Sequence, residues 1–148
     1  MIPANSIIIA KAFEGYFARP YICPAGIATI GWGATRYPDG RRVMLQDPPV
    51  TEEEAMSLLL WELEGCSRSV SRLCPALLTD EGRFGAIVDF AFNLGAGRLQ
   101  ASTLRRKINQ LAWDEVPGQL LKWVYGGGRK LPGLVRRRQA EAVYFLLQ

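Results

Sequence analysis

Apolar and polar residues follow two different patterns in the first third of the chain. Residues 1–14 contain an apolar run that stops at Gly15, which indicates a helix capped at its start by Asn5 or Ser6. Apolar residues then alternate with others in GIATIGW, and the cluster YPDGRR has the composition of a turn. Residues 16–45 are therefore predicted to form a small twisted sheet of two or three strands.

The rest of the chain has the patterns of helices. Thr51 followed by Glu54 is a capping box, and the long helix that it opens should end at Cys74, because a residue before proline avoids the helical region. The next segment, RFGAIVDFAFNLG, is apolar on nearly all sides, which is typical of the buried centre of a helical bundle. The caps expected for the helices that follow the long one are Thr79, Ser102 and Asp114.

The last helix is expected to begin at Pro132, after a flexible break at residues 126–128. Its apolar residues are expected to face inward: Leu134, Val143, Leu146 and Leu147. A helix, a small sheet and then several helices predict an α+β fold, with a single domain over residues 1–148. The sheet-containing lobe covers about residues 13–50 and the helical lobe about residues 51–148 plus the N-terminal helix, with an active-site cleft between them.

The composition agrees with a folded domain and concentrates positive charge in one half. Hydrophobic residues make up 49% of the chain and charged residues 22%, and the formal net charge is +4. Residues 1–74 carry 7 Lys and Arg against 8 Asp and Glu, whereas residues 75–148 carry 11 against 6, most densely in RKLPGLVRRR. This charge distribution favours binding to nucleic acid, an anionic envelope or acidic substrates. The alternative is that the basic residues form only a solvated helix face.

Several chemistries are excluded by residues that the sequence lacks. There is no histidine, so Ser-His and Cys-His catalysis are excluded, and without histidine or a CxxC pair no metal site is expected. Acid-base chemistry must then come from Glu, Asp, Cys, Tyr or Lys, and no cofactor is implied. The apolar run at residues 7–10 is too short for a signal peptide or a membrane span, so we expect no export segment and no stable membrane anchor.

Glu14 is the first candidate for this chemistry. It lies where the first helix meets the predicted sheet, flanked by Phe13, Tyr16 and Phe17. Aromatic side chains exclude water, and the carbonyl end of a helix disfavours negative charge, so both are expected to raise the pKa of this carboxyl group. A carboxyl that is neutral near pH 7 can serve as a general acid. The alternative is a solvated surface glutamate.

The spacing around Glu14 carries a family resemblance. Glu14, Cys23 and Thr29 form E-x8-C-x5-T, followed by IGWGAT. This resembles the phage lysozymes of glycoside hydrolase family 24, whose signature is E-x8-(D/C)-x5-T before a T-I-G-x-G strand. The segments TEEEA, DFAFNLGAG, STLRRKIN and WVYGGGRKLPGLVRRRQAE follow in the order of the family. The resemblance therefore covers nearly the whole chain and implies a lysozyme-like fold with a small antiparallel sheet.

The resemblance also implies catalytic roles. Glu14 corresponds to the general acid that protonates the glycosidic oxygen, and Thr29 to the threonine beside the attacking water. Cys23 occupies the place usually held by aspartate. An unperturbed thiol has a pKa of about 8.5 and is only slightly ionised at pH 7. Cys23 is therefore left open as base, water-positioning group, covalent nucleophile or near-spectator.

Three further residues are expected to hold the substrate. By the resemblance, Asn93 matches a polar position that helps to hold the sugar chain. One arginine of residues 136–138 pairs with the catalytic glutamate, and we favour Arg137. Trp32, in the predicted hairpin, is the tryptophan most suited to the cleft, although an indole at this position could equally belong to the core.

These assignments predict an endolysin that hydrolyses the β-1,4 bond between N-acetylmuramic acid and N-acetylglucosamine in peptidoglycan. The resemblance favours inversion, and the sequence itself leaves both inversion and retention open. We expect a monomer that stays in the host cytoplasm until a separate holin-type membrane protein lets it reach the wall. Two alternatives remain: a peptidoglycan-binding module that has lost catalysis, suggested by the missing aspartate, and a basic nucleic-acid-binding domain. The second lacks the expected mixture of basic and aromatic residues on one helix face.

The remaining cysteines, Cys66 and Cys74, are eight residues apart. On a straight helix that separation is about 12 Å, beyond the roughly 7 Å limit for bridged α-carbons. We therefore expect both to be reduced, unless the helix bends between them. A lock in which Cys23 pairs with one of them is the alternative.

Overall fold

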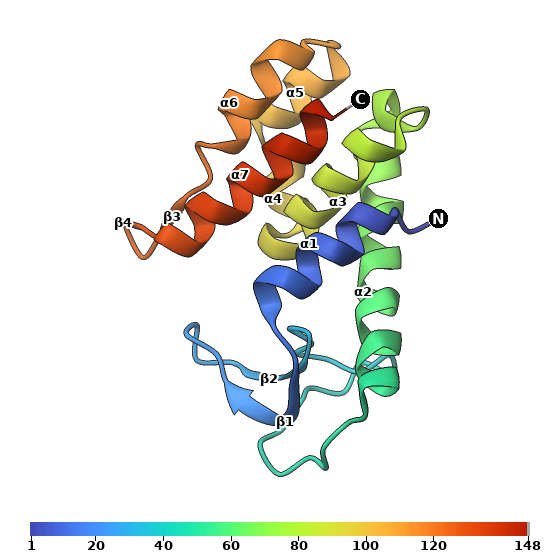
Figure 1. The fold of residues 1–148 in the computed structure, drawn as a ribbon, viewed down its shortest axis with the longest axis vertical. Coiled ribbons are helices and arrows are strands. Elements are labelled where there is room, and N and C mark those ends of the chain that lie inside the picture. Colours follow the sequence, from blue (N-terminus) through green and yellow to red (C-terminus); the bar gives the residue numbers. More distant parts are fainter. Residues whose placement is uncertain (148) are drawn as a thin grey trace.

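The computed structural model describes residues 1–147 as a helical lobe above a smaller lobe built on a β-hairpin (Figure 1). Helix α1 (Ala4–Glu14) leads down into the hairpin, and α2 (Glu52–Leu73) returns from it along the helical lobe. The helical lobe is completed by α3 (Glu81–Leu94), α4 (Ala96–Gln100), α5 (Thr103–Asn109), α6 (Val116–Leu120) and α7 (Pro132–Leu146), with 3-10 turns at Pro75–Leu77 and Trp113–Glu115. The predicted α+β fold is confirmed.

The small lobe contains two antiparallel strands, β1 (Phe17–Ile22) and β2 (Ala28–Gly31). Their register places Phe17 opposite Gly31 and Ile22 opposite Ala28, with an irregularity between the two pairs. The rest of the segment predicted as sheet contributes only isolated bridges, from Ile30 to Ala34 and from Arg36 to Arg42.

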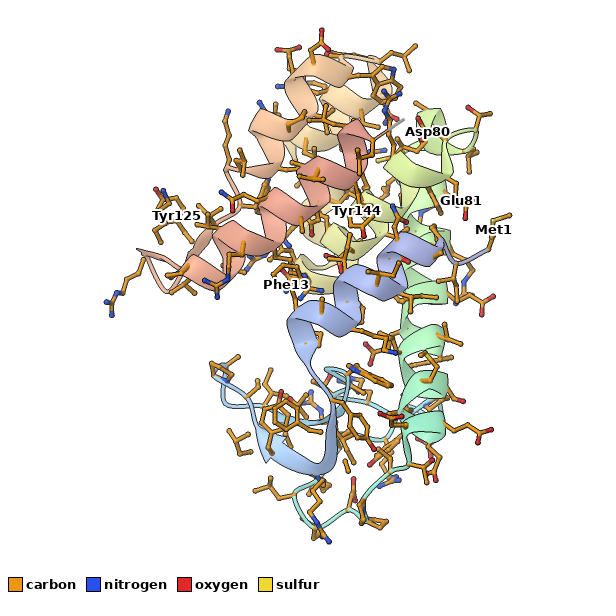
Figure 2. The ribbon with its side chains drawn as sticks, in the orientation of Figure 1. Met1, Phe13, Asp80, Glu81, Tyr125 and Tyr144 are labelled. Atoms are coloured by element: carbon orange, nitrogen blue, oxygen red, sulfur yellow. The ribbon has the colours of Figure 1, made fainter. Side chains whose placement is uncertain are left out.

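The predicted flexible break at residues 126–128 is part of a second hairpin. Strand β3 (Tyr125–Gly126) pairs with β4 (Arg129–Lys130), and Gly127 and Gly128 turn the chain between them at positive φ. Tyr125 projects from this hairpin away from the helices (Figure 2). The glycine run therefore forms a defined turn that leads into α7.

Helix α3 forms the centre of the core, as its apolar composition predicts. It contacts α1, α2 and α7, and its side chains from Phe84 to Ala91 are all buried. The predicted cap of α2 is also present, because the Glu54 amide donates to Thr51 Oγ1 at 3.1 Å. This helix runs without interruption to Leu73, so Cys66 and Cys74 lie far apart along it, and all three cysteines are free.

Three of the expected helix caps are wrong. Helix α1 begins at Ala4, directly after Pro3. Asn5 and Ser6 do not cap it, because the side-chain amide of Asn5 donates to the Gly82 carbonyl and the Ser6 hydroxyl donates to the Pro3 carbonyl. The cap of α3 is Asp80 rather than Thr79, and Asp114 lies within a 3-10 turn. Ser102 caps α5 as predicted.

The inward face of α7 differs from the prediction. Val143, Leu146 and Leu147 are exposed, and Leu134 is half-buried. The buried residues of this helix are instead Arg137, Arg138, Glu141, Ala142 and Phe145. The charged side of α7 faces α3, which supplies polar partners for it. Within residues 1–147, no helix is both long and apolar enough to cross a lipid bilayer.

The corrected cap of α3 can be tested with adjacent alanine substitutions. Asp80→Ala removes the acceptor of the Arg83 amide, and caps of this kind contribute about 1 kcal/mol to the free energy of unfolding. Thr79→Ala, at an exposed neighbour, should change it by less than about 0.5 kcal/mol. Urea denaturation of both variants measures this difference. A larger loss from Thr79→Ala would restore the original prediction.

Candidate active site

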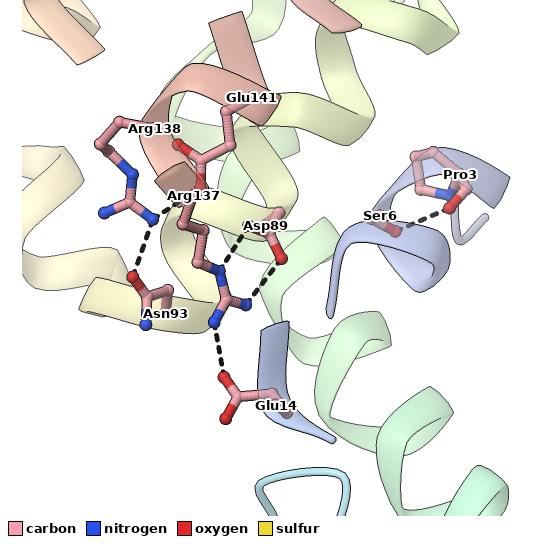
Figure 3. A network of polar contacts seen from close by, with 8 residues as sticks. All are labelled: Pro3, Ser6, Glu14, Asp89, Asn93, Arg137, Arg138 and Glu141. Atoms are coloured by element: carbon pink, nitrogen blue, oxygen red, sulfur yellow. Dashed lines mark hydrogen bonds and ion pairs between the residues drawn. The ribbon is translucent and has the colours of Figure 1, made fainter. Parts of the chain in front are cut away.

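The candidate site is centred on the guanidinium group of Arg137, which joins three helices (Figure 3). Its Nη1 donates to Glu14 Oε1 at 2.7 Å, while Nε and Nη2 donate to the two oxygens of Asp89 at 2.9 and 2.8 Å. The rings of Phe13 and Phe92 lie beside it, 5.6 and 5.8 Å from Cζ. Arg137, the arginine favoured from the sequence, thus connects the last residue of α1 to α3 and α7.

Burial makes these contacts strong. The side chain of Asp89 is fully buried, that of Arg137 is 5% exposed and that of Glu14 is 24% exposed. Two parallel hydrogen bonds between a guanidinium and a carboxylate fix the orientation of both groups. Burial opposes the charge of Arg137, but Asp89 and then Glu14 raise its pKa, so it remains a cation. Glu14 is therefore held by a rigid positive group while part of its surface stays open.

The second oxygen of Glu14 lies against the backbone that follows β2. A Cβ atom built on Gly33 would lie 2.8 Å from Glu14 Oε2, and Gly33 has a φ of +82°. Glycine tolerates both this backbone conformation and the close approach. At the other side, Gly15 (φ 72°) ends α1 and turns the chain into the hairpin. The two oxygens of Glu14 therefore have different surroundings.

A second buried arginine lies next to the first (Figure 3). One nitrogen of Arg138, Nη2, donates to Asn93 Oδ1 and to Glu141 Oε1, both at 2.7 Å. The amide oxygen of Asn93, which was expected to help hold the sugar chain, is therefore engaged by the protein. Arg138 was considered from the sequence only as an alternative to Arg137, and Glu141 was not identified as part of the site.

Cys23 and Thr29 lie on the hairpin, at the end of β1 and within β2. The backbone N–H of Ile27 lowers the pKa of the Cys23 thiol, partial burial opposes this, and the Thr29 hydroxyl lowers it further. Thr29 is buried, and its hydroxyl also has the Ile27 carbonyl as an acceptor at 2.9 Å. A hydroxyl has one proton, so it can serve only one of these acceptors at a time.

Tyr21 shows that the hairpin and Glu14 share one electrostatic environment. Burial raises the pKa of this phenol, and the charges of Glu14 and of Cys23 raise it further. Its side chain also stacks on Phe17, with the ring centroids 4.2 Å apart. Tyr21 is therefore within electrostatic reach of two of the three residues of the sequence motif.

Glu62, on α2, is a carboxyl that the sequence analysis missed. Burial raises its pKa to about 7, and the charge of Glu14 contributes to the increase. Together with Cys66, Phe92 and other residues it lines a hollow of about 300 Å³. The helical spacing of the buried Leu59 and of Cys66 places Glu62 on their side of α2, and this pattern could have identified it.

Trp32 is not placed as expected for a residue that stacks on sugars. Only 7% of its surface is exposed. Its ring packs against Tyr16, with centroids 5.1 Å apart, and the Lys11 ammonium lies 4.5 Å from the ring centroid. The indole belongs to the core, and a largely buried ring has no open face for a sugar. Among residues 1–147, no three His, Cys, Asp or Glu side chains come together as a metal site.

Comparison with known proteins gives a consistent result. The family model described as phage lysozyme matches residues 11–141. Over 128 residues the chain is 34% identical to the SAR-endolysin of bacteriophage PS34, across 86% of this chain and 73% of that protein. An endolysin structure from the Escherichia coli O157:H7 phage FAHEc1 is similar with a TM-score of 0.89 at 28% identity, covering 99% of this chain and 94% of that one. A variant of P22 lysozyme is similar with a TM-score of 0.84 at 29% identity, covering 99% and 98%. The chain therefore belongs to the phage lysozyme family.

Proposed function

We propose that this protein is an endolysin that hydrolyses the β-1,4 bond between N-acetylmuramic acid and N-acetylglucosamine in peptidoglycan. Membership of the phage lysozyme family makes it a lysozyme-type glycoside hydrolase. The observation that carries the proposal is the position of Glu14, whose carboxyl is held by a buried arginine beside the hairpin with Cys23 and Thr29.

Glycoside hydrolysis requires a proton on the leaving oxygen and a second group on the opposite face of the sugar. Oε1 of Glu14 accepts from Arg137, so the proton that is transferred belongs on Oε2. Gly33 leaves room beside that oxygen because it has no side chain. Glu14 can therefore act as the general acid while Arg137 keeps its orientation constant.

Cys23 is proposed as the second group. Its thiol ionises more easily than an ordinary one, because the Ile27 amide stabilises the thiolate. A thiolate can accept a proton from water, orient the water or attack the sugar. Thr29, beside it, is proposed to help hold the attacking water through its hydroxyl. Asn93 remains a proposed contact of the sugar chain, through the part of its amide that Arg138 does not occupy.

The structure argues against the alternative of a nucleic-acid-binding domain. Two of the three arginines at 136–138 are buried in contacts with carboxyl groups, so this run does not form a basic surface. The exposed cations of this region, Lys122, Arg129, Lys130 and Arg136, suit approach to an anionic cell wall. We further propose that the protein acts as a monomer, stays in the host cytoplasm before lysis and depends on a separate holin-type membrane protein for release.

The central test replaces the proton donor. Glu14→Gln keeps the shape of the side chain but has no proton to give, so lysis of exposed cell walls should fall by at least about 100-fold. Glu64→Gln, the same change at an exposed position on α2, should leave lysis unchanged. Wall turbidity measures both, with circular dichroism as the check of folding. If Glu14→Gln keeps more than about a tenth of the activity, Glu14 is not the acid.

Two substitutions at Cys23 test the second group. Cys23→Asp should remain active because it introduces the commoner residue of the motif, whereas Cys23→Ala should lose at least about tenfold in lysis rate, by loss of a group in the acid-base chemistry. Cys66→Ala, which removes a different thiol, serves as the control. Full activity of Cys23→Ala would make Cys23 a spectator.

A glycine pair tests the placement of Glu14. Gly33 and Gly40 both have positive φ, but only a Cβ at Gly33 would meet Glu14. Gly33→Ala should lower the lysis rate about 100-fold by displacing the carboxyl, whereas Gly40→Ala should keep it, although backbone strain of about 1 kcal/mol is expected in both. Equal activity of the two variants at a temperature where both are folded would contradict this placement.

A further inference from the structure

The network around Arg137 contains more carboxyl groups than arginines. Arg137 and Arg138 contact three carboxyl side chains: Glu14, Asp89 and Glu141. Asp89, Arg138 and Glu141 have fully buried side chains, and Arg137 is nearly so. If all five groups were ionised, the network would carry a net charge of −1. Glu14 is partly exposed, so water can solvate its charge, whereas a buried carboxylate oxygen without a partner is strongly disfavoured.

One buried oxygen in this network lacks a hydrogen-bond partner. Glu141 Oε1 accepts from Arg138, but Oε2 is buried and has no hydrogen-bond partner as a carboxylate oxygen. The Asp89 carboxyl lies within hydrogen-bonding reach of Glu141. Both Asp89 oxygens already accept from Arg137, and each carboxylate oxygen can accept a further bond. A proton on Glu141 Oε2 would therefore give the buried oxygen a partner.

We propose that Glu141 is protonated in the folded protein, donates a hydrogen bond from Oε2 to the Asp89 carboxylate, and thereby acts as a positioning residue for Glu14. Figure 3 shows the contacts from Asp89 to Arg137 and from Arg137 to Glu14, and the proposed bond from Glu141 to Asp89 extends them into one chain. The fourth member of this chain is the proposed general acid, so the positioning role rests on the proposed function. The protonation of Glu141 does not.

The surroundings of Glu141 agree with a neutral carboxyl. The charged groups that face it are Asp89 from α3 and Arg138 from its own helix, one of each sign. Burial and then the contact with Asp89 raise the pKa of Glu141, and Arg138 opposes them. Asn93 shares the Arg138 nitrogen that contacts Glu141, so the positive charge of Arg138 is directed at two acceptors.

A glutamine at this position distinguishes the two protonation states. The amide of Glu141→Gln can donate to Asp89 and accept from Arg138, as the protonated acid does. A carboxyl whose pKa is raised by folding contributes stability that is lost as the pH increases, because unfolding then releases its proton. The ratio of folded to unfolded protein should therefore be similar for Glu141→Gln and wild type near pH 4. As the pH increases, this ratio should become larger for Glu141→Gln than for wild type, by up to about tenfold per pH unit.

Urea unfolding from about pH 4 to about pH 8 measures this ratio. Glu62 is present in both proteins, so its own titration cancels in the comparison. The exposed Glu64→Gln should show no such pH-dependent gain. An ionised Glu141 paired with Arg138 would give the opposite sign: Glu141→Gln would be less stable than wild type at pH 7, with the difference closing toward pH 4. That result, or a glutamine variant that does not fold, would overturn the proposal.

The positioning role is tested by kinetics on soluble glycan oligosaccharides at a temperature where each variant is folded. Glu141→Leu removes the donor to Asp89 and should lower kcat at least about tenfold, with KM within about twofold because the side chain of Glu141 is fully buried and does not touch the substrate. Glu141→Gln should restore kcat. A leucine variant with wild-type kcat would refute the positioning role. If the leucine variant does not fold, a tenfold lower kcat in Glu141→Gln would refute that role instead. If wild type cleaves no glycan, the proposed function fails, while the unfolding comparison still decides the protonation of Glu141.

Discussion

The buried pair of Arg137 and Asp89 is the interaction on which the arrangement of the helical lobe depends. A guanidinium with 5% exposure requires a carboxylate at its nitrogens, and Asp89 supplies both of its oxygens from the centre of α3. This requirement explains why α7 turns a charged face inward and leaves Leu146 and Leu147 exposed. The third nitrogen of Arg137 is directed at the end of α1, where it meets Glu14.

Close backbone approaches bring the hairpin lobe to this fixed group. Gly31 packs against α2, where an added Cβ would lie 3.1 Å from Ala55, and Gly33 packs against Glu14 in the same way. A larger residue at either position would separate the lobes. The proposed acid and the proposed second group, Cys23, therefore come from different parts of the fold, and small residues let them share one site.

Local signals in the sequence predicted the order of the helices and the hairpin, although they misassigned three helix caps, and contacts between distant segments explain why the inward face of α7 was missed. Signals that act within one turn of their own helix were read correctly: the caps Thr51 and Ser102, the helix stop Gly15 and the first residue Pro132. Their roles follow from neighbouring residues. The inward face of α7 could not be predicted this way. Arg137 lies on that face and pairs with Asp89, which is 48 residues away in the sequence. Apolar spacing alone predicted that leucines of α7 would face the core.

The candidate site shows the same division. The motif with Glu14, Cys23 and Thr29 was identified by its resemblance to the family, and Arg137 was favoured by the same resemblance. Glu141 was missed because a charged residue in a helix is usually solvated, and only the folded chain shows that it is buried. Glu62 is partly buried, and its spacing from Leu59 and Cys66 was a signal that was not used. Trp32 was left open between the cleft and the core because an aromatic residue in a hairpin can face either, and the structure buries it.

In the proposed mechanism, Glu14 donates a proton while water attacks the sugar. Mass spectrometry of the fragments released from purified peptidoglycan, with the reaction run in water enriched in heavy oxygen, tests this directly. Hydrolysis by this mechanism should release fragments that end in a reducing N-acetylmuramic acid carrying one heavy oxygen. Fragments with anhydro ends and no heavy oxygen would contradict it, because they would show cleavage without the attack of water.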